Sequence, residues 1–176
     1  GMDIPLIRRF ACGYVQGAKY ANAKAEVLQN MTGTTGAAWN DPVKGAELAK
    51  SQIDRGVDVV YHAAGGTGVG VLRAAADAGK LGIGVDSNQN WIKPGVILTS
   101  MVKVVDLAVY DTIKDTQAGK FTAGIVQYGL KNQGVDYTVD KYNEKLITAE
   151  MKKKVEDIKK KIIAGQIQVP DYYKKK

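Results

Sequence analysis

The chain of 176 residues contains 45% hydrophobic and 24% charged residues, a composition that fits an ordinary globular domain and excludes a disordered or fibrous chain. The length favours one α/β lobe over two, because single domains commonly have about 100 to 150 residues. The formal net charge is +7, and no apolar run approaches the roughly 18 residues that a membrane-spanning helix needs.

The first predicted element is a helix. Apolar residues recur at intervals of three and four over 6–22, as one face of an amphipathic helix requires, and Pro5 suits its first turn. The apolar residues within 25–32 then predict a short strand that leads into the polar loop at 33–36.

A second helix is expected to begin with Pro42. Asn40 or Asp41 can cap it, because short polar side chains accept hydrogen bonds from the first free N–H groups of a helix. Gly56 ends this helix. The apolar run at 57–61 is then typical of a strand that is covered on both faces.

The alternation continues to the end of the chain. The next predicted elements are a helix over 69–78 that stops at Gly79, a strand over 81–85 that finishes at 86–88, a strand over 96–98, a helix over 102–116, an extended segment over 121–130, and a helix from Thr148 or Glu150 to Gly165. Alternating strands and helices with short connections predict an α/β fold, a parallel sheet with helices on both faces.

Ligands of such a sheet bind at the carboxyl ends of the strands, where loops and helix N-termini gather. The glycine-rich run at 65–70 lies at this edge. It fits a dinucleotide-binding fingerprint poorly, since the third glycine of that pattern falls on Val71, although Asp86 follows at a suitable distance. Nicotinamide binding therefore stays open as an alternative to glycines that merely allow tight turns.

Three further side chains at this edge have chemistry that suits a sugar or a base. Asp86 ends a strand, where its carboxylate can accept from vicinal hydroxyls or cap the following turn. Trp39 offers a flat face for stacking, or serves as a lid on the core. Lys103 precedes a helix, where a cation is unfavourable unless a ligand oxygen or a nearby carboxylate compensates.

Catalytic and metal-binding patterns are sparse. The one histidine, His62, lies in an apolar strand and is interpreted as a core imidazole rather than a general base, and Cys12 has no histidine close in sequence. One histidine and one cysteine cannot supply the usual metal shell. Neither a metal nor a cofactor is expected, and the sequence favours a binding protein over an enzyme.

The basic charge does not indicate nucleic acid. Nine lysines fall in the last 25 residues without interleaved aromatic side chains, and we interpret them as the solvated face of a helix and a tail. These lysines are at positions 152, 153, 154, 159, 160, 161, 174, 175 and 176.

Several stretches together carry a resemblance to a known family. They are GMDIPLIRRF at 1–10, WNDPVKG at 39–45, AAGGTG at 63–68, GVDSNQ at 84–89 and LTSMVK at 98–103. With these motifs in this order, the chain resembles the C-terminal half of the basic membrane protein family of solute-binding lipoproteins, which includes purine nucleoside receptors of bacterial ABC importers.

The resemblance implies one lobe of a type I periplasmic binding protein, whose two lobes close on a ligand. Residues 1–99 and 120–176 would form the C-terminal ligand-binding lobe. The helix at 100–119 would pack with the missing N-terminal lobe. Without that partner, the apolar face of this helix favours self-association of the fragment.

The resemblance also implies roles for site residues. Trp39 stands where such receptors stack an aromatic ring on the purine, with Trp in place of the more usual Phe. Gly65 and Gly66 stand where backbone groups meet the nucleoside, Asp86 where a carboxylate takes the ribose hydroxyls, and Lys103 where a cation completes the sugar contacts.

The expected function is therefore that of a solute-binding component of a bacterial ABC importer, with a nucleoside as ligand and the membrane permease as partner. The full-length parent is expected in the cell envelope, periplasmic or anchored as a lipoprotein, although no signal segment opens this chain. A receptor for another sugar-like solute, an NAD-dependent or nucleoside-processing enzyme, and a ligand-sensing regulator stay open.

Overall fold

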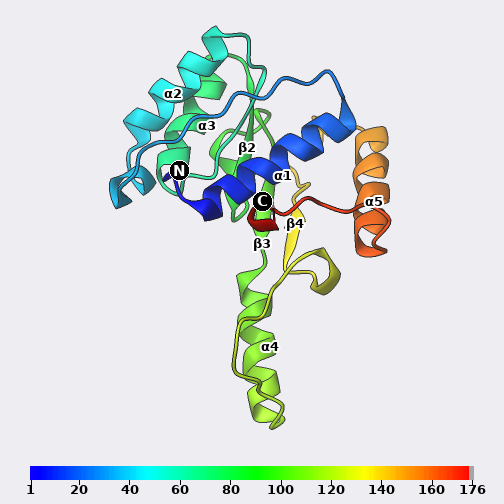
Figure 1. The fold of residues 1–176 in the computed structure, drawn as a ribbon. Coiled ribbons are helices and arrows are strands. Elements are labelled where there is room, and N and C mark those ends of the chain that lie inside the picture. Colours follow the sequence, from blue (N-terminus) through cyan, green and yellow to red (C-terminus); the bar gives the residue numbers. More distant parts are fainter. Residues whose placement is uncertain (175–176) are drawn as a thin grey trace.

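Within residues 1–174, four strands form one sheet in the order β1-β2-β3-β4 (Figure 1). The computed structural model describes residues 1–174. The strands are β1 (Val59–Tyr61), β2 (Leu81–Asp86), β3 (Ile97–Lys103) and β4 (Val135–Tyr137), and the helices are α1 (Pro5–Ala21), α2 (Pro42–Asp54), α3 (Thr67–Asp77), α4 (Val105–Gln117) and α5 (Ala149–Ile163).

The sheet is mostly parallel. β1 pairs with β2, and β2 with β3, in parallel, whereas β4 runs antiparallel to β3 with Met101 opposite Tyr137. The α/β class predicted from the sequence is confirmed. The antiparallel strand β4 was not predicted, because its three residues carry no run of apolar positions.

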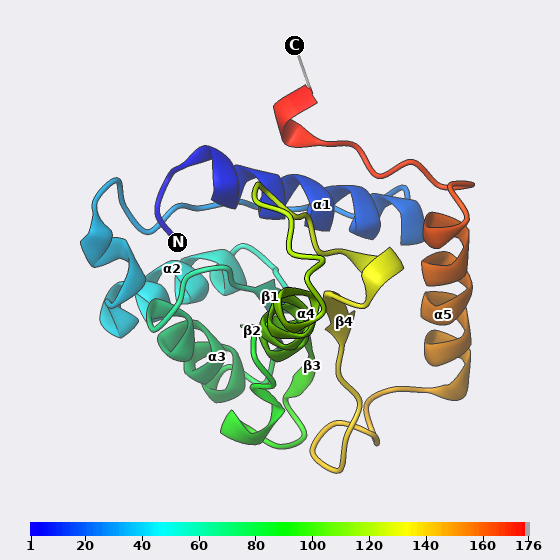
Figure 2. The ribbon, with the colours of Figure 1, turned by 90° about the horizontal axis from the view of Figure 1, so that it is seen from below.

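Helices cover both faces of the sheet. α1 lies on one face and α3, with α2 beside it, on the other (Figure 2). On the α1 side, the ring of Tyr14 packs on that of Tyr61 at 4.9 Å between centroids. On the other side, the core joins α2 and α3 to β1 through Ala49, Val60, Val71, Ala74 and Ala75.

The helix starts follow their capping residues. Asp41 is the N-cap of α2 and accepts a hydrogen bond from the backbone N–H of Lys44 at 2.9 Å. Thr148 caps α5 in the same way, with the N–H of Met151 as donor. The sequence offered two candidates at each helix, and the structure selects these.

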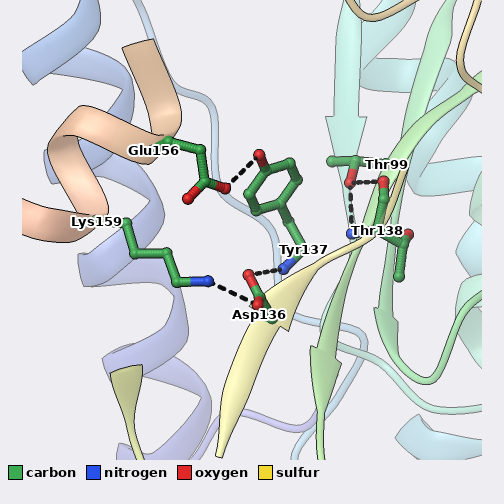
Figure 3. Close-up of polar contacts among 6 residues, drawn as sticks. All are labelled: Thr99, Asp136, Tyr137, Thr138, Glu156 and Lys159. Atoms are coloured by element: carbon green, nitrogen blue, oxygen red, sulfur yellow. Dashed lines mark hydrogen bonds and ion pairs between the residues drawn. The ribbon is translucent and has the colours of Figure 1, made fainter. Parts of the chain in front are cut away.

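Polar contacts attach α5 to the edge of the sheet (Figure 3). Tyr137 donates to Glu156 at 2.8 Å, and the Nζ of Lys159 donates to Asp136 at 2.7 Å. Partial burial and the neighbouring Glu156 carboxylate raise the pKa of Tyr137 to about 12. The lysine-rich helix α5 is thus fixed to β4 by contacts from its inner side.

Two predictions differ from the structure. Residues 25–32 form no strand; the isolated parallel bridge between Met2 and Gly33 follows them. The strand expected over 96–98 continues to Lys103, so the helix expected from 102 begins at Val105. The segment over 121–130, predicted to be extended, lies outside the α-helices and strands, and Leu130 begins a short 3-10 helix.

α4 projects away from the sheet, and residues 118–129 return beside it (Figures 1 and 2). No residue of α4 is buried. Its apolar side chains Val105, Val109 and Ile113, spaced four apart on one face, are all more than half exposed. Among the residues that the structure describes, no helix is both long enough and apolar enough to cross a membrane.

Candidate ligand-binding site

Asp86 and Lys103 meet at the carboxyl edge of the sheet. Each is the last residue of its strand, and Lys103 Nζ lies 2.7 Å from Asp86 Oδ1. Both side chains are about half exposed. Asp86 has a φ of +70°, a left-handed conformation that costs a non-glycine residue of order 1–3 kcal/mol and is common at functional sites.

An aromatic ring completes this pair. The Nζ of Lys103 lies 4.9 Å from the centroid of the Phe10 ring, a cation–π contact with α1. Phe10 was missed as a site residue from the sequence, because its spacing in 6–22 assigned it only to the inner face of a helix. Phe10 in α1 and Lys103 at the end of β3 lie far apart in the sequence, so no local pattern predicts their contact.

Trp39 lies against Gly65 and Gly66. Trp39 ends the short 3-10 helix at Gly36–Trp39, and a Cβ at Gly65 would lie 3.6 Å from its ring and 3.1 Å from its carbonyl oxygen. Gly65 has a φ of +55°, which favours glycine. The loop after β1 therefore brings its backbone close to the indole.

The glycines that follow have a packing role. A Cβ at Gly68 would overlap the His62 ring, and a Cβ at Gly70 would overlap the backbone of Pro42. Both glycines thus allow α3 to approach its neighbours closely. This accounts for the glycine-rich run without a dinucleotide.

His62 is buried beneath the site, with 4% of its surface exposed. Its Nε2 lies 2.9 Å from Gln89 Oε1, which also accepts the backbone N–H of Val85, so Nε2 carries the hydrogen. Burial lowers the pKa of His62 to about 4, and its Nδ1 has no partner among residues 1–174. The imidazole is therefore neutral near pH 7.

A hydrogen-bond network fixes the loop after Asp86. The N–H of Gln89 donates to Ser100 Oγ, and Ser100 donates to Asn90 Oδ1 at 2.8 Å. Asn88 and Asn90 both donate to Asp140, and these bonds lower the pKa of that carboxyl group. The loop is tied both to β3 and to the segment after β4.

The predicted residues thus form two groups at one edge of the sheet. Asp86 pairs with Lys103, and Trp39 packs on Gly65. No three His, Cys, Asp or Glu residues within 1–174 come together as a metal site.

Comparison with known proteins finds that the chain is similar to proteins of ABC transport systems. A family model described as "ABC transporter substrate-binding protein PnrA-like" matches residues 1–172. The ABC transporter nucleoside-binding protein BmpA of Lactococcus lactis subsp. cremoris is 37% identical, over 97% of this chain and 51% of that protein. An uncharacterized lipoprotein of Pyrococcus abyssi is 40% identical, over 78% of this chain and 35% of that protein.

Two solved structures share the fold. An ABC transporter solute-binding protein from Aeropyrum pernix K1 has a TM-score of 0.79 and 32% identity, covering 97% of this chain and 56% of that chain. A transcriptional activator of the comK gene from Bacillus halodurans has a TM-score of 0.75 and 29% identity, covering 89% and 52%. The chain spans about half, or less, of the length of the curated relatives it matches.

Proposed function

Because this chain belongs to the family of PnrA-like ABC transporter substrate-binding proteins, we propose that it is the C-terminal lobe of a receptor that binds a nucleoside between two lobes. The observation that carries the proposal is the pair formed by Asp86 and Lys103 at the carboxyl edge of the sheet, 2.7 Å apart and open to solvent. Ligands of open α/β sheets bind at this edge.

Asp86 is the acceptor for the sugar. Its Oδ1 is held by Lys103, and its Oδ2 has no partner among the described residues. A carboxylate with a free oxygen can accept from the neighbouring 2′ and 3′ hydroxyls of a ribose, and the strong charge-assisted bonds would favour such a ligand over a deoxy sugar. The Nζ of Lys103 supplies a hydrogen-bond donor for a sugar oxygen beside these two hydroxyls.

Trp39 and the loop after β1 hold the base. The indole offers a stacking face, which suits the flat ring of a purine. The N–H groups of Gly65 and Gly66 donate to no backbone or side-chain acceptor within 1–174, so both are free for a polar atom of the ligand. Gly65 brings its backbone against the indole, so that stacking and hydrogen bonding converge.

The other wall of the cleft belongs to a further lobe. α4 has no buried residue and projects from the sheet. These are features of a helix that packs on another domain. We assign α4 to contacts with that lobe. The helix predicted over 100–119 is corrected to Val105–Gln117, because residues 100–103 belong to β3 and carry Lys103 into the site. The segment 118–129 lies beside α4 (Figure 1), and we assign the rest of 1–99 and 120–176 to the ligand-binding lobe.

With this transport role we propose a membrane permease as partner and the cell envelope as the location of the parent protein. The relative from Pyrococcus abyssi is named a lipoprotein, which supports a lipid anchor. The match with a transcriptional activator favours ligand sensing as a second candidate function. Both functions would use the same nucleoside site, since proteins of one fold can use ligand binding either for transport or for regulation.

Fluorescence of Trp39 tests the proposal. Replacing the exposed Trp91 by Phe leaves Trp39 as the only indole. We expect adenosine, inosine or guanosine to change its emission with a dissociation constant in about the millimolar range, because one wall buries only part of the ligand. 2′,3′-Dideoxyadenosine and the Asp86→Asn variant should bind at least about tenfold more weakly, the loss expected when charge-assisted bonds are removed.

Equal binding of ribose and adenosine would instead indicate a receptor for another sugar-like solute. The proposal would be contradicted if none of the three nucleosides changed the Trp39 emission at roughly 20 mM, about 20-fold above the expected dissociation constant.

A further inference from the structure

Gln89 lies between the two groups of the candidate site. Its side chain reaches from the loop after β2 to the end of β1, where its Oε1 lies 2.9 Å from Nε2 of His62. The same oxygen accepts the backbone N–H of Val85, also at 2.9 Å. His62 directly follows β1 on the way to Gly65, and Val85 directly precedes Asp86. The carboxamide therefore bridges the loop that carries Gly65 and the strand end that carries Asp86.

Hydrogen bonds fix the orientation of this carboxamide. A backbone N–H only donates, so the atom of Gln89 that faces Val85 is the oxygen and not the nitrogen. Oε1 has two lone pairs, and the donors of Val85 and His62 occupy both. The backbone N–H of Gln89 donates to Ser100 Oγ at 3.0 Å and anchors the other end of the residue. The carboxamide thus has no acceptor left, and only its Nε2 can bind a further group.

The strand β2 leaves room for this side chain. A Cβ at Gly84 would lie 2.8 Å from the Cβ of Gln89 and 3.0 Å from its Oε1, too close for ordinary packing. The last residue of β2 that pairs with β1 is Ile83. The N–H of Val85, two residues further on, therefore meets the Gln89 side chain in place of a strand carbonyl. The carboxamide occupies the sheet edge where β1 stops.

The Nε2 of Gln89 is an unused donor that reaches the surface. Both hydrogen bonds of the side chain within 1–174 end on Oε1. Among the described residues, the only fully buried side-chain nitrogen or oxygen without a partner is Nδ1 of His62. Nε2 of Gln89 also has no partner there, so it is not fully buried. A donor of fixed orientation is therefore accessible between the ends of β1 and β2.

This position suits the junction of a base and a sugar. In the proposed function, on which this inference rests, Asp86 binds the ribose and Gly65 with Trp39 holds the base, so the glycosidic bond lies near Gln89. A purine carries one acceptor beside that bond, its N3 atom. We propose that Gln89 is a specificity-determining residue, whose Nε2 donates to N3 of the bound purine. The site then selects nucleosides that have an acceptor at this position.

Base analogues test the proposal on the unchanged protein. 3-Deazaadenosine has a C–H group in place of N3, and 7-deazaadenosine keeps N3 and is the control. NMR titration of the Trp39 indole signal gives each dissociation constant. We expect 3-deazaadenosine to bind at least about tenfold more weakly than adenosine, because the donor of Gln89 is left without a partner. Equal affinities of adenosine and 3-deazaadenosine would overturn the proposal.

Gln89→Glu is the matched variant. Its carboxylate keeps an acceptor for Val85 and His62 but has no donor for N3. Adenosine should bind this variant at least about tenfold more weakly, and its preference over 3-deazaadenosine should disappear. The ratio of the affinities for 7-deazaadenosine and adenosine should stay that of the unchanged chain. A preference for adenosine over 3-deazaadenosine that persists in the variant would overturn the proposal, since Gln89 would then only support the loop.

The outcomes separate this inference from the proposed function. Equal binding of adenosine and 3-deazaadenosine, together with weaker adenosine binding by Asp86→Asn, would overturn the role of Gln89 and leave the nucleoside site in place. Absence of binding by adenosine and both analogues would overturn the proposed function and this inference with it. The result that supports both is a loss on removing N3 that depends on the amide of Gln89.

Discussion

The Nζ of Lys103 lies 2.7 Å from Oδ1 of Asp86, between the ends of two neighbouring parallel strands. Lys103 comes two residues before α4, where the positive end of a helix disfavours a cation. A ligand oxygen or a carboxylate could compensate, and in the structure the carboxylate is present. The site therefore holds a charge pair that is ordered before any ligand arrives.

The first prediction concerns the cost of losing this pair. Asp86→Asn should change the free energy of unfolding by less than about 1 kcal/mol, since half-exposed ion pairs contribute little and Asn accepts a left-handed backbone. Urea unfolding followed by circular dichroism measures it. Asp86→Val is the contrasting variant and should cost about 2 kcal/mol or more, because a branched side chain is strained at a φ of +70°. Equal losses in both variants would refute this explanation.

The second prediction concerns the protonation of His62. The chain has one histidine, so its C2 proton gives a single NMR signal. Burial lowers the pKa to about 4, and the signal should stay at its neutral position until the pH falls well below 6. A midpoint near 6.5 would show that the ring is exposed to water, against the buried contact with Gln89.

The third prediction is the effect of this histidine on stability. Between pH 6.5 and about 4, His62 is protonated in the unfolded chain but stays neutral in the folded chain. The free energy of unfolding therefore falls as the pH is lowered through that window. The two pKa values differ by roughly 2.5, equivalent to about 3 kcal/mol. His62→Gln keeps a donor toward Gln89 and should lose this dependence. Parallel profiles of the two proteins from pH 7 to 4 would contradict it.

The fourth prediction concerns α4. Val105, Val109 and Ile113 present an exposed apolar face, and the isolated chain should associate through it at high concentration. Sedimentation equilibrium should show a mass that rises with concentration, and the double variant Val109→Lys with Ile113→Lys should be monomeric. Asp111→Lys, on the opposite side of the helix, is the control and should still associate. A wild-type chain that stays monomeric at millimolar concentration would show the prediction to be wrong.

The sequence predicted those elements whose limits depend on local chemistry. Asp41 before Pro42 and Thr148 before a charged amphipathic run both cap helices, because a side-chain oxygen satisfies the first free N–H groups whatever the rest of the fold does. The apolar strand at 57–61 was equally clear. Asp86 and Lys103 were chosen by the rule that binding residues gather after parallel strands, and the structure joins them in an ion pair; their role in binding stays a prediction.

Elements that depend on distant partners were not predictable in this way. β4 exists through its pairing with β3 and its contacts with α5, neither of which leaves a local pattern. Residues 25–32 have the composition of a strand, yet a strand needs a neighbour, and the space beside them contains none. The contact of Phe10 with Lys103 joins positions 93 residues apart in the sequence, a relation that helical periodicity does not encode.

Chemical-shift mapping of the 176-residue chain with millimolar adenosine tests the central claim most directly. The account predicts shifts at the Trp39 indole and at the amides of Gly65, Gly66, Asp86 and Lys103, and none in 25–31. Asp86→Asn should reduce them strongly at the same adenosine concentration, since its affinity is expected to fall about tenfold, while its spectrum stays that of a folded chain. Shifts confined to 25–31, or shifts at Trp39 that persist unchanged in the Asp86→Asn variant, would contradict the claim that these residues form one nucleoside-binding wall.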